Sequence, residues 1–497
     1  MSAQAYLAID LGAESGRAIV GVLDGHKLTL HEAHRFFHMP RRLPSGLHWD
    51  LMGLWGNILE GTQKAVTWCK KNSTPLVSLG VDTWGVDWAL VSRSGELTFL
   101  PHAYRDERNN AAYEKTLATI GRQALYEATG TQFMPLNTLF QLVAQYDAAP
   151  GTVTEATDML FMPDLFHFFF TGRRVVEFSI ASTSQMLDAR TGKWAKKILE
   201  AIDLPTQMLG EISPSGTVVG PVLRHIGEEL GAEPGLKVIT PAAHDTACAV
   251  AAVPASDSSW CYISSGTWSL MGAELDKPCL SVAAREAPFT NEGGVDGTIR
   301  FLKNLAGLWL VQECRRQWQR QGREYDYATL TDLAAEAEPF RTLVDTDHAP
   351  FAAPGDMPGK IAAFASRTHQ PQPQTPGQFV RTCLESLALT YRRTLEKLES
   401  VLGRRFEVIH IVGGGGRNHL LNQMTADATG RRVVVGPYEA TAAGNILVQA
   451  MGAGNVKDLT HLRKIVAAAF EPQTFVTSKD TDAWDDAFTR FVSLIDR

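Results

Sequence analysis

Apolar runs broken by short polar turns recur along the chain and predict strand-turn-strand units. The first unit spans residues 6–23 and has its polar turn at 12–16. Residues 76–91 and 260–271 repeat the form, each with a turn that holds small or hydroxyl residues. Such a unit therefore opens both halves of the chain, and we interpret the repetition as a weak internal repeat.

A different unit is predicted near the C-terminus. A β-rich run at 406–412 is followed by four glycines, Gly413–Gly416, and then by a helical pattern that ends at Gly430. Three valines at 433–435 predict the next strand. Strand, glycine loop, helix and strand together indicate an α/β fold.

The length of the chain predicts more than one domain. It has 497 residues, whereas a single hydrophobic core seldom grows beyond about 250–300 residues. We expect the division near 245–260, where the strand-turn-strand form begins again. The stretch 350–376 holds six prolines, and we interpret it as a surface excursion within the second lobe, not a linker.

Composition and charge argue against several classes of protein. The net charge of −7 disfavours non-specific binding to nucleic acid or to an anionic membrane. The six cysteines form no zinc-type cluster and are too sparse for a disulfide scaffold. The sequence shows neither a signal peptide nor a stretch of the ~20 apolar residues that a membrane span needs. We therefore expect a cytoplasmic enzyme.

The turn at 10–17 could bind phosphate. Its two glycines would let the backbone approach a ligand, and Arg17 offers a rigid fork of hydrogen-bond donors. Asp10, at the end of a buried strand, could hold Mg²⁺ directly or through water. A polar hairpin turn without any ligand explains the same composition equally well.

The four glycines at 413–416 could cradle a nucleotide. They do not form a dinucleotide fingerprint, because Asn418 stands where a third glycine is needed, and no Walker A motif is present. A glycine run between strand and helix still offers bare backbone and a helix N-terminus to a nucleotide. The alternative is a turn that merely needs positive φ. Four successive glycines exceed that need, so we favour the nucleotide loop.

The tripeptide His244-Asp245-Thr246 supplies a candidate general base. Phosphoryl transfer to an alcohol needs a carboxylate that accepts the hydroxyl proton, and Asp245 follows an apolar run at 238–239. An alanine-rich run comes next, so Asp245 could instead cap a helix. The two interpretations are compatible.

Two further groups of residues suit a sugar pocket. Residues 82–88 and 104–108 combine aromatic rings with carboxylates and arginines, which can stack on a sugar and hydrogen-bond to its hydroxyls. The alternative is tryptophans in the core and a solvated charged face. Asn304 and Gln312 would share one face of a helix and could line a cleft, or could lie on a plain surface helix.

The order of these motifs resembles the FGGY family of carbohydrate kinases. The motifs that carry the resemblance are, in order, DLGAESGR, DTWGVDW, YRDER, HDTACAV, SSGTWSLMG, NEGG, KNLAGLWLVQ and IVGGGGRN. It extends from about Leu7 to about Ala450. DTWGVDW, SSGTWSLMG and KNLAGLWLVQ are the specific parts, whereas DLG and the glycine run are shared with many actin-like ATPases.

The resemblance implies an α/β fold of two actin-like (ribonuclease H-like) lobes, with ATP and sugar in a cleft between them. Each lobe would be a mixed sheet flanked by helices. Residues 1–249 would form the N-terminal lobe, with the sugar site and the first phosphate loop. Residues 250–497 would form the C-terminal lobe, which binds the adenosine part of the nucleotide.

The resemblance also implies roles for individual residues. Asp245 matches the proton acceptor for the sugar hydroxyl, and Asp10 matches a carboxylate near Mg²⁺. The implied substrate contacts are Gly85, His244, Asp245, Thr246 and Asn304. The implied contacts to ATP, the co-substrate, are Ala13, Glu14, Ser15, Gly16, Arg17, Thr267, Gln312 and Gly414.

Two positions depart from the family pattern. Glu14 stands where a small hydroxyl residue is expected. A carboxylate that faces phosphates would be repelled, so we expect its side chain to turn away and only its backbone N–H to be used. The fourth glycine, Gly416, should only loosen its loop.

The reaction implied is transfer of the γ-phosphoryl group of ATP to the 1-hydroxyl of L-rhamnulose. The alternatives are a kinase of another ketose such as L-fuculose or L-ribulose, a non-kinase actin-like ATPase, and an inactive sugar sensor. The intact Asp245 counts against the last. We expect no nucleic-acid or membrane partner, and a monomer or a small homo-oligomer.

Overall fold

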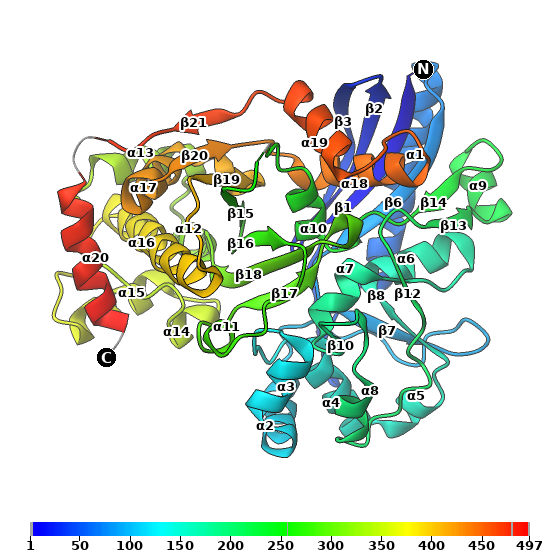
Figure 1. Cartoon of the computed structure of the whole chain (residues 1–497), viewed down its shortest axis with the longest axis horizontal. Helices are drawn as coiled ribbons and strands as arrows, with labels where there is room; N and C mark the ends of the chain where they lie inside the picture. Colours follow the sequence, from blue (N-terminus) through cyan, green and yellow to red (C-terminus); the bar gives the residue numbers. More distant parts are fainter. Residues whose placement is uncertain (1–2, 256, 479–480, 496–497) are drawn as a thin grey trace. The chain divides into compact units, whose positions relative to one another are not determined.

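The computed structural model describes residues 3–255, 257–478 and 481–495 (Figure 1). The chain forms two compact units, each built from three stretches. Unit 1 comprises Met1–Pro254, Glu274–Phe301 and Ala440–Phe470, and unit 2 comprises Ala255–Ala273, Leu302–Glu439 and Glu471–Arg497. The expected lobes, 1–249 and 250–497, concern which part binds which ligand, and that division stays a prediction.

Unit 1 is built on a six-stranded sheet in the order β13-β14-β6-β1-β2-β3. Its strands are β1 (Gln4–Leu11), β2 (Ser15–Asp24), β3 (Lys27–Phe37), β6 (Leu76–Thr83), β13 (Val218–Pro221) and β14 (Lys237–Ile239). β1 is antiparallel to β2 and parallel to β6, which is parallel to β14. β1 is buried along almost its whole length, as its nearly continuous apolar run requires.

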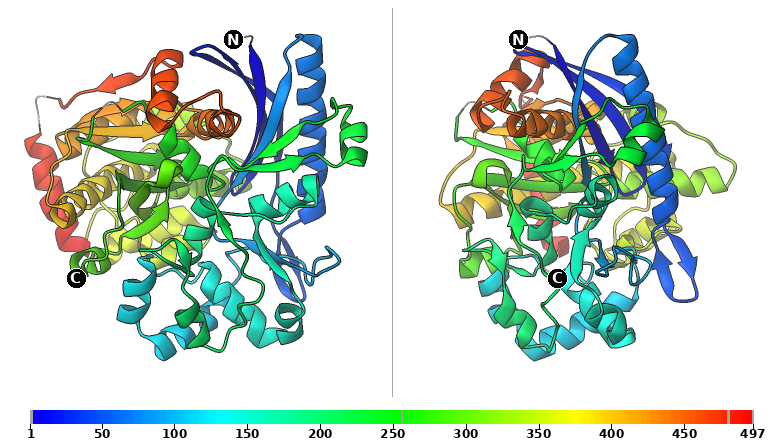
Figure 2. Two further views of the ribbon diagram at one scale, coloured as in Figure 1. Left: turned by 45° about the vertical axis from the view of Figure 1, so that its right-hand side comes forward. Right: turned by 90° about the vertical axis from the view of Figure 1, so that its right-hand side faces the viewer.

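Helices cover both faces of this sheet (Figure 2). α1 (Leu51–Lys71) packs on β1, β2 and β3, while α18 (Ala440–Gly452) packs on β1, β6 and α10 (Asp245–Ala251). α18 is also hydrogen-bonded to the sheet. Asn445 Nδ2 donates to Asp82 Oδ2 at 2.6 Å, and Gln449 Nε2 donates to the Leu7 carbonyl at 2.9 Å. A segment from late in the chain thus completes the unit that begins at the N-terminus.

Unit 2 repeats the strand order of unit 1. β15 (Trp260–Ser265) is antiparallel to β16 (Trp268–Leu275) and parallel to β19 (Val408–Val412), which is parallel to β20 (Arg432–Val435). β18 (Ile299–Ala306) lies next to β16, and β21 (Gln473–Phe475) lies next to β20. The hairpin followed by parallel strands corresponds to β2, β1, β6 and β14. This repetition confirms the expected fold class and the internal repeat.

The helices of unit 2 are α12 (Trp309–Arg320), α13 (Tyr327–Glu336), α14 (Ala349–Ala352), α15 (Met357–Arg367), α16 (Pro376–Leu402), η3 (Gly414–Arg417), α17 (His419–Thr429) and α20 (Asp482–Ile495). α16 packs against α12, α13 and α17. The proline-rich stretch 350–376 lies within this unit, as expected. It is not only a surface excursion, because α15 buries Met357, Ile361 and Phe364.

The remaining elements of unit 1 lie outside its six-stranded sheet. They are β4 (Arg41–Leu43), β5 (Gly46–His48), β7 (Trp88–Val91), α2 (Arg108–Ile120), α3 (Arg122–Thr129), α4 (Thr138–Ala148), α5 (Pro150–Thr154), β8 (Asp158–Phe161), α6 (Met162–Thr171), β9 (Val176–Glu177), α7 (Phe178–Ala181), η1 (Ser182–Ser184), β10 (Leu187–Asp188), β11 (Lys193–Trp194), α8 (Lys196–Glu200), β12 (Ile212–Ser213), α9 (Arg224–Leu230), α11 (Val282–Glu286), β17 (Thr290–Gly293), η2 (Val295–Gly297) and α19 (Leu459–Ala469). In the part of the chain that the structure describes, no helix has the length and apolar character needed to cross a bilayer.

The structure corrects two expectations about secondary structure. β7 follows β6 in sequence but pairs with β8 instead of forming a hairpin with β6, because the turn at 84–87 sends the chain away from the sheet. Asn304 lies on the strand β18, whereas Gln312 lies on α12, which begins at Trp309. A separation of eight residues places two side chains on one face of a strand as well as of a helix, so the spacing could not distinguish the two.

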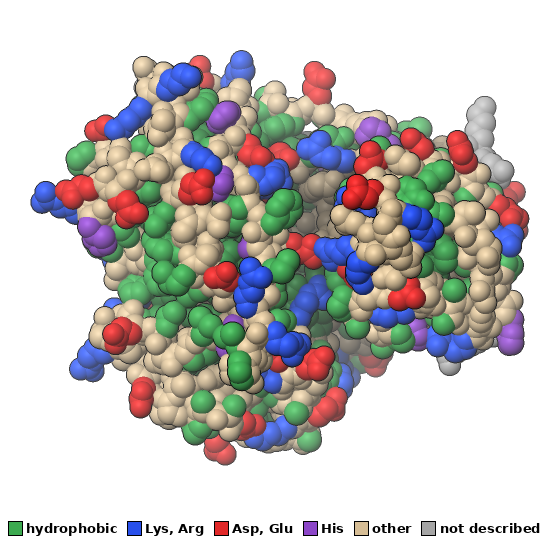
Figure 3. All heavy atoms as spheres, turned by 180° about the vertical axis from the view of Figure 1, so that it is seen from behind, with side chains coloured by type: hydrophobic (Ala, Val, Ile, Leu, Met, Phe, Trp, Pro, Cys, Tyr) green, Lys and Arg blue, Asp and Glu red, His purple; other side chains and the backbone are tan. Residues whose placement is uncertain are grey.

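Acidic and basic side chains are interspersed over the face of each unit that Figure 3 shows. This agrees with the small net charge of −7. A face of mixed charge offers no uniform field to a polyanion such as nucleic acid.

Candidate functional site

Three carboxyl groups gather at the carboxyl ends of neighbouring strands in unit 1. Asp10 lies near the end of β1 and Asp82 near the end of β6, and the two are register partners. Asp245 begins α10, just after β14, and the preceding His244 forms an isolated bridge with Thr83. In open α/β sheets this edge, outside the strand ends, is where ligands bind.

The predicted phosphate loop, residues 13–17, comprises the end of the turn between β1 and β2 and the first three residues of β2. Arg17 faces its cross-strand partner Asp10 and forms an ion pair with it. A β-carbon on Gly16 would overlap the Phe36 ring, so Gly16 is required by packing. A β-carbon on Gly12 would meet only the Ser15 carbonyl, at 3.5 Å. The glycine at 12 is therefore not demanded by the fold and leaves the turn open.

Glu14 lies at the tip of this turn and is exposed, and its carbonyl accepts a hydrogen bond from the His38 N–H at 3.1 Å. His38 was not singled out from the sequence. Its Nε2 lies 2.8 Å from the Gly12 carbonyl, and its ring stands 5.4 Å from that of Trp84. Burial lowers the pKa of His38 despite its contacts with backbone carbonyls. The ring therefore braces the turn.

Asp245 lies at the start of α10, in contact with both of its sequence neighbours. Its Oδ1 accepts hydrogen bonds from the N–H and the hydroxyl of Thr246, at 2.5 and 3.1 Å, and lies 3.4 Å from His244 Nε2. Burial and the charge of Asp10 raise the pKa of Asp245, although His244 acts in the opposite direction. His244, not Asp245, occupies the N-cap position of α10. The simple capping interpretation is therefore wrong.

Asp82 is wholly buried beside these groups. Its Oδ2 accepts the hydrogen bond from Asn445, and its Oδ1 has no partner among the described residues. Burial, together with the charges of Asp10 and Asp245, raises the pKa of Asp82 well above its usual range. Because two adjacent carboxylates repel, the sheet edge favours one protonated carboxyl group.

Gly85 stands opposite His244. A β-carbon at Gly85 would lie 3.4 Å from His244 Nε2 and 3.3 Å from the Thr183 methyl group. The next residue, Val86, has φ +68°, a conformation that costs a β-branched residue energy. Thr138 Oγ1 donates to the Val86 carbonyl at 2.6 Å and holds it there. Glycine at position 85 therefore lets this turn pack closely against His244 and Thr183.

The aromatic residues of the 82–88 motif belong to the core. Trp84 and Trp88 are buried, and Asp87 has no exposed surface. Asp87 accepts hydrogen bonds from Trp49 and Trp84 through Oδ2, at 2.6 and 2.9 Å. Gln141 donates to its Oδ1 at 3.0 Å. These residues therefore fit the alternative interpretation, in which the tryptophans belong to the core, and Asp87 has no exposed surface through which to meet a sugar.

The charged residues at 104–108 differ in their exposure to solvent. Arg105 and Glu107 are exposed, as a solvated face would be, whereas Asp106 and Arg108 are half-buried. Asp106 accepts a 2.7 Å hydrogen bond from the Leu47 N–H. The half-buried Asp106 therefore links this charged run to β5.

In unit 2 the two predicted nucleotide loops meet. Thr267 lies in the turn between β15 and β16, and the glycine run follows the parallel strand β19. Gly413 has φ +88°, and a β-carbon there would lie 2.9 Å from the Ser265 carbonyl. A β-carbon on Gly415 would overlap the Ser265 hydroxyl. The glycines therefore let one loop pack directly on the strand that leads into the other.

Gly414 differs from its neighbours. A β-carbon there would have no atom within 4 Å, and its φ is not positive. Gly416 is buried, and a β-carbon there would lie 2.8 Å from Val435. The expectation that Gly416 only loosens the loop is wrong, because packing requires it. Gly414 alone of the four is left for a ligand to approach.

Gln312 lies near the start of α12, the helix that contacts the turn holding Thr267. The Trp309 N–H donates to the Thr267 carbonyl at 3.2 Å, which joins helix and turn. Gln312 Oε1 is buried and has no hydrogen-bond partner among the described residues. A buried acceptor without a partner costs free energy, so this oxygen is suited to a ligand donor such as an amine or a ribose hydroxyl. Asn304 is half-buried on β18.

Mg²⁺ fits the site as a companion of ATP. No group of three or more His, Cys, Asp or Glu side chains within the described ranges could hold a metal ion. Mg²⁺ commonly binds through one or two carboxylates together with substrate phosphates and water. Asp10, at the phosphate turn, can supply one such carboxylate.

Comparison with known proteins finds matches along nearly the whole chain. Residues 5–252 match the N-terminal domain of the FGGY family of carbohydrate kinases, and residues 261–453 match its C-terminal domain. The rhamnulokinase of Bacteroides thetaiotaomicron is 40% identical over 494 residues, which cover 99% of each chain. The rhamnulokinase of Oceanobacillus iheyensis is 38% identical over 95% of this chain and 98% of its own.

Solved structures share the fold. Gluconate kinase from Lactobacillus acidophilus aligns with a TM-score of 0.82 and 14% identity, over 100% of this chain and 98% of its own. Ligand-bound xylulose kinase from the same organism aligns with a TM-score of 0.81 and 14% identity, over 99% and 98%.

Proposed function

Because this chain belongs to the FGGY family of carbohydrate kinases, we propose that it phosphorylates the 1-hydroxyl of L-rhamnulose. ATP and L-rhamnulose would give ADP and L-rhamnulose 1-phosphate. The observation that carries the proposal is Asp245, whose carboxyl group has a raised pKa and stands beside His244, which in turn lies close to Gly85. The sugar is assigned from the rhamnulokinases that are 35–40% identical over nearly the full chain.

Asp245 is proposed as the general base. As the sugar hydroxyl attacks the γ-phosphorus of ATP, its proton passes to the carboxylate of Asp245 and the bond to the β-phosphate oxygen breaks. His244 and Thr246 flank that carboxylate and are proposed to bind the sugar together with Gly85. Asn304, on β18, is proposed as a further sugar contact.

The phosphates of ATP are assigned to turns that offer backbone N–H groups as hydrogen-bond donors. Residues 13–17 are proposed to donate N–H groups to them, and Glu14 would contribute only its N–H. Mg²⁺, when bound with ATP near Asp10, would neutralise charge that develops on the phosphate oxygens. Thr267 is proposed as the second phosphate contact, and Gln312 and Gly414 as contacts to the nucleoside.

ADP release tests the proposal. Mg²⁺-ATP would be supplied with L-rhamnulose, L-fuculose, L-ribulose or D-xylulose, and with no sugar. We expect L-rhamnulose to exceed both the blank and the other ketoses by at least about tenfold in kcat/KM, which corresponds to about 1.4 kcal/mol. A different best ketose would overturn the substrate assignment and leave the kinase assignment in place. Equal release with and without every sugar would favour an ATPase.

ATP and a free ketose meet in the cytoplasm, and we propose that the chain acts there. We propose a monomer or a small homo-oligomer as the active form. Sedimentation of the purified protein at several concentrations would decide between them.

A further inference from the structure

The segment 177–184 contacts the backbone that leads into the proposed base. It consists of the last residue of β9, the helix α7 and the turn η1, and it belongs to unit 1, as Asp245 does. Glu177 and Ser179 have no exposed surface, and the proposed reaction gives neither of them a role. Because buried polar groups need hydrogen-bond partners, the partners of these two side chains show what they hold in place.

Glu177 accepts several hydrogen bonds through one carboxylate oxygen. Its Oε2 accepts from the Ser179 hydroxyl at 2.6 Å and from the Ala243 N–H at 3.1 Å. The Ile180 N–H donates to the same oxygen at 3.1 Å, and the Ser215 hydroxyl donates to Oε1 at 2.6 Å. The carboxylate is thus fixed through both of its oxygens and joins the start of α7 to Ala243.

The peptide group between Ala243 and His244 is held at both of its ends. Its N–H, on His244, donates to Ser179 Oγ at 3.2 Å. Its carbonyl, on Ala243, accepts from the Thr83 N–H at 2.9 Å. A peptide group is planar, so hydrogen bonds on its two sides fix its orientation. Asp245 follows one residue later, and the direction in which its side chain leaves the backbone depends on this peptide group.

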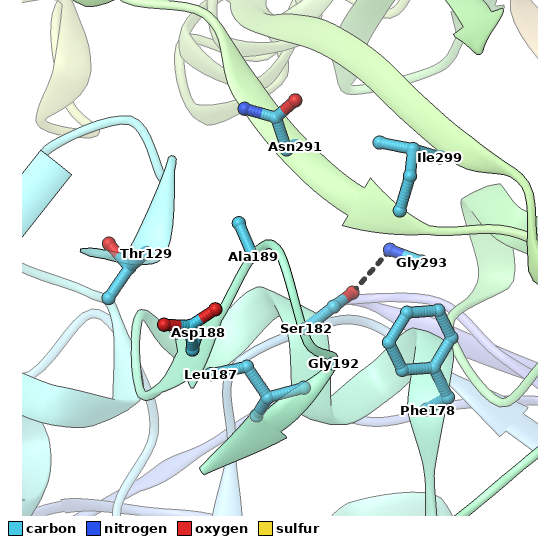
Figure 4. Close-up of a pocket in the computed structure, with 10 residues that line it drawn as sticks. All are labelled: Thr129, Phe178, Ser182, Leu187, Asp188, Ala189, Gly192, Asn291, Gly293 and Ile299. Atoms are coloured by element: carbon cyan, nitrogen blue, oxygen red, sulfur yellow. Dashed lines mark hydrogen bonds between the residues drawn. The ribbon is translucent and has the colours of Figure 1, made fainter. Parts of the chain in front are cut away.

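The other end of the segment holds two further elements of unit 1. Thr183 Oγ1 accepts from the Val86 N–H at 3.0 Å, in the turn at 84–87. Figure 4 shows the hydrogen bond in which the Gly293 N–H donates to the Ser182 hydroxyl, at 2.7 Å. The segment therefore links this turn and β17 to the start of α10.

We propose that Glu177 and Ser179 are positioning residues that hold the backbone before Asp245, so that its carboxylate is directed at the hydroxyl of the sugar. This inference rests on the proposed function of Asp245 as general base. Ser179 holds the His244 N–H, and Glu177 holds both Ser179 and the Ala243 N–H. A general base must lie within hydrogen-bond reach of the proton that it accepts. A turned backbone would therefore slow proton transfer without weakening the binding of ATP.

Hydrogen exchange tests the contact without any turnover. Ser179→Ala removes the acceptor of the His244 N–H, so we expect a peptide that covers residues 240–246 to exchange its amide hydrogens faster than in the wild type. Unchanged exchange in this peptide would overturn the proposal. The readout stands even if L-rhamnulose proves to be the wrong substrate.

Ser184→Ala is the matched control. Ser184 is as fully buried as Ser179. It donates one hydrogen bond, to the Ala181 carbonyl at 2.6 Å, and accepts one from a backbone N–H, that of Met186, at 3.1 Å. The control therefore loses the same kinds of bond without touching the backbone before Asp245. We expect its 240–246 peptide to exchange as in the wild type, and equally fast exchange in both variants would overturn the proposal.

Kinetics with the best ketose of the substrate panel test the consequence. We expect Ser179→Ala to lose about 100-fold in kcat, as misplacement of a reacting group does, with the KM for ATP unchanged. In the Asp245→Asn background the same change should cause no further loss, because the base that it positions is already gone. An equal loss in both backgrounds would show a merely structural role and overturn the proposal. Full turnover in Asp245→Asn alone would instead overturn the proposed base, which separates the two failures.

Glu177 offers a test that does not depend on whether Ser179→Ala folds. Glu177→Gln keeps the length of the side chain and one oxygen for the donors at Oε2, and its amide can donate to the Ser215 hydroxyl. We expect its kcat to stay near that of the wild type. Glu177→Asp keeps the charge but draws the carboxylate back from the Ala243 N–H, and we expect a loss of at least about tenfold in kcat. The reverse order of the two variants would overturn the proposal, because charge and not reach would then be what matters.

Discussion

Trp49 Nε1 donates a 2.6 Å hydrogen bond to the carboxylate of Asp87, and this bond ties the loop before α1 to the turn after β6. Trp84 and the Tyr104 N–H donate to the same oxygen, and Gln141 donates to the other. Asp87→Ala would leave several buried donors without partners. We expect a loss of about 3 kcal/mol or more in the free energy of unfolding, measured by urea denaturation. Asp24→Ala, at an exposed position, should change stability little, and an equal effect in both variants would contradict this role.

Asp245→Asn tests the base. The amide oxygen can still accept from the Thr246 N–H, so the start of α10 should keep its shape. We expect kcat to fall by roughly 100- to 10,000-fold. The affinity for a non-hydrolysable ATP analogue, measured by calorimetry, should stay within about twofold. Undiminished turnover would remove Asp245 from its proposed role.

Gly414 and Gly415 form a matched pair. Gly414→Ala adds a methyl group to open space, so its melting temperature should equal that of the wild type. Its KM for ATP should rise about tenfold, or roughly 1.4 kcal/mol, because the methyl group would meet the nucleotide. Gly415→Ala should instead lower stability by about 1–3 kcal/mol, because its β-carbon would overlap Ser265. Unchanged ATP kinetics in Gly414→Ala would argue against nucleotide binding at this loop.

His102 predicts a pH dependence of stability. Its ring is packed between Arg108, 2.8 Å from Nε2, and Asp106, 3.1 Å from Nδ1, with the His48 ring 3.8 Å away. Burial, with the charges of Arg108 and His48 and against the pull of Asp106, lowers the pKa of His102 to about 4. In the unfolded chain a histidine titrates near 6.5. The unfolded state therefore binds more protons between these values, and stability falls as the pH drops through them.

Between pH 7 and pH 5 the expected loss from His102 is about 2 kcal/mol. His102→Gln should lack this part of the loss, whatever its stability at pH 7. Urea midpoints of both proteins at the two pH values would measure the difference. Parallel losses in wild type and variant would contradict the assignment.

Short-range pairing made the two hairpins predictable. β1 with β2 and β15 with β16 each join neighbours across a few turn residues, so the apolar runs and the polar turn define them. β7 could not be placed this way, because its partner β8 begins at Asp158, far along the chain. Nothing in the sequence indicates that Val86 has a positive φ and redirects the chain.

The sequence could suggest candidate residues where a motif carries the chemistry, as in His244-Asp245-Thr246. Contacts between residues far apart in the sequence could not be predicted in this way. Glu292 and Arg300 come together with His244 only through the pairing of β17 with β18 and the placement of α10. His38 meets Gly12 because β3 folds back beside β2. Likewise, the sequence could not show which of the four glycines is required by packing, because that depends on the positions of Ser265 and Val435 in the fold.

The late arrival of α18 has a consequence for how the protein is made. Asn445 and Gln449 satisfy Asp82 and the Leu7 carbonyl in a sheet whose strands all emerge from the ribosome before residue 240. During synthesis these polar groups lack their partners on α18 until some 200 further residues have been added. The half of the chain that carries Asp245 is thus made first, but its sheet gains its covering helix α18 only late in synthesis.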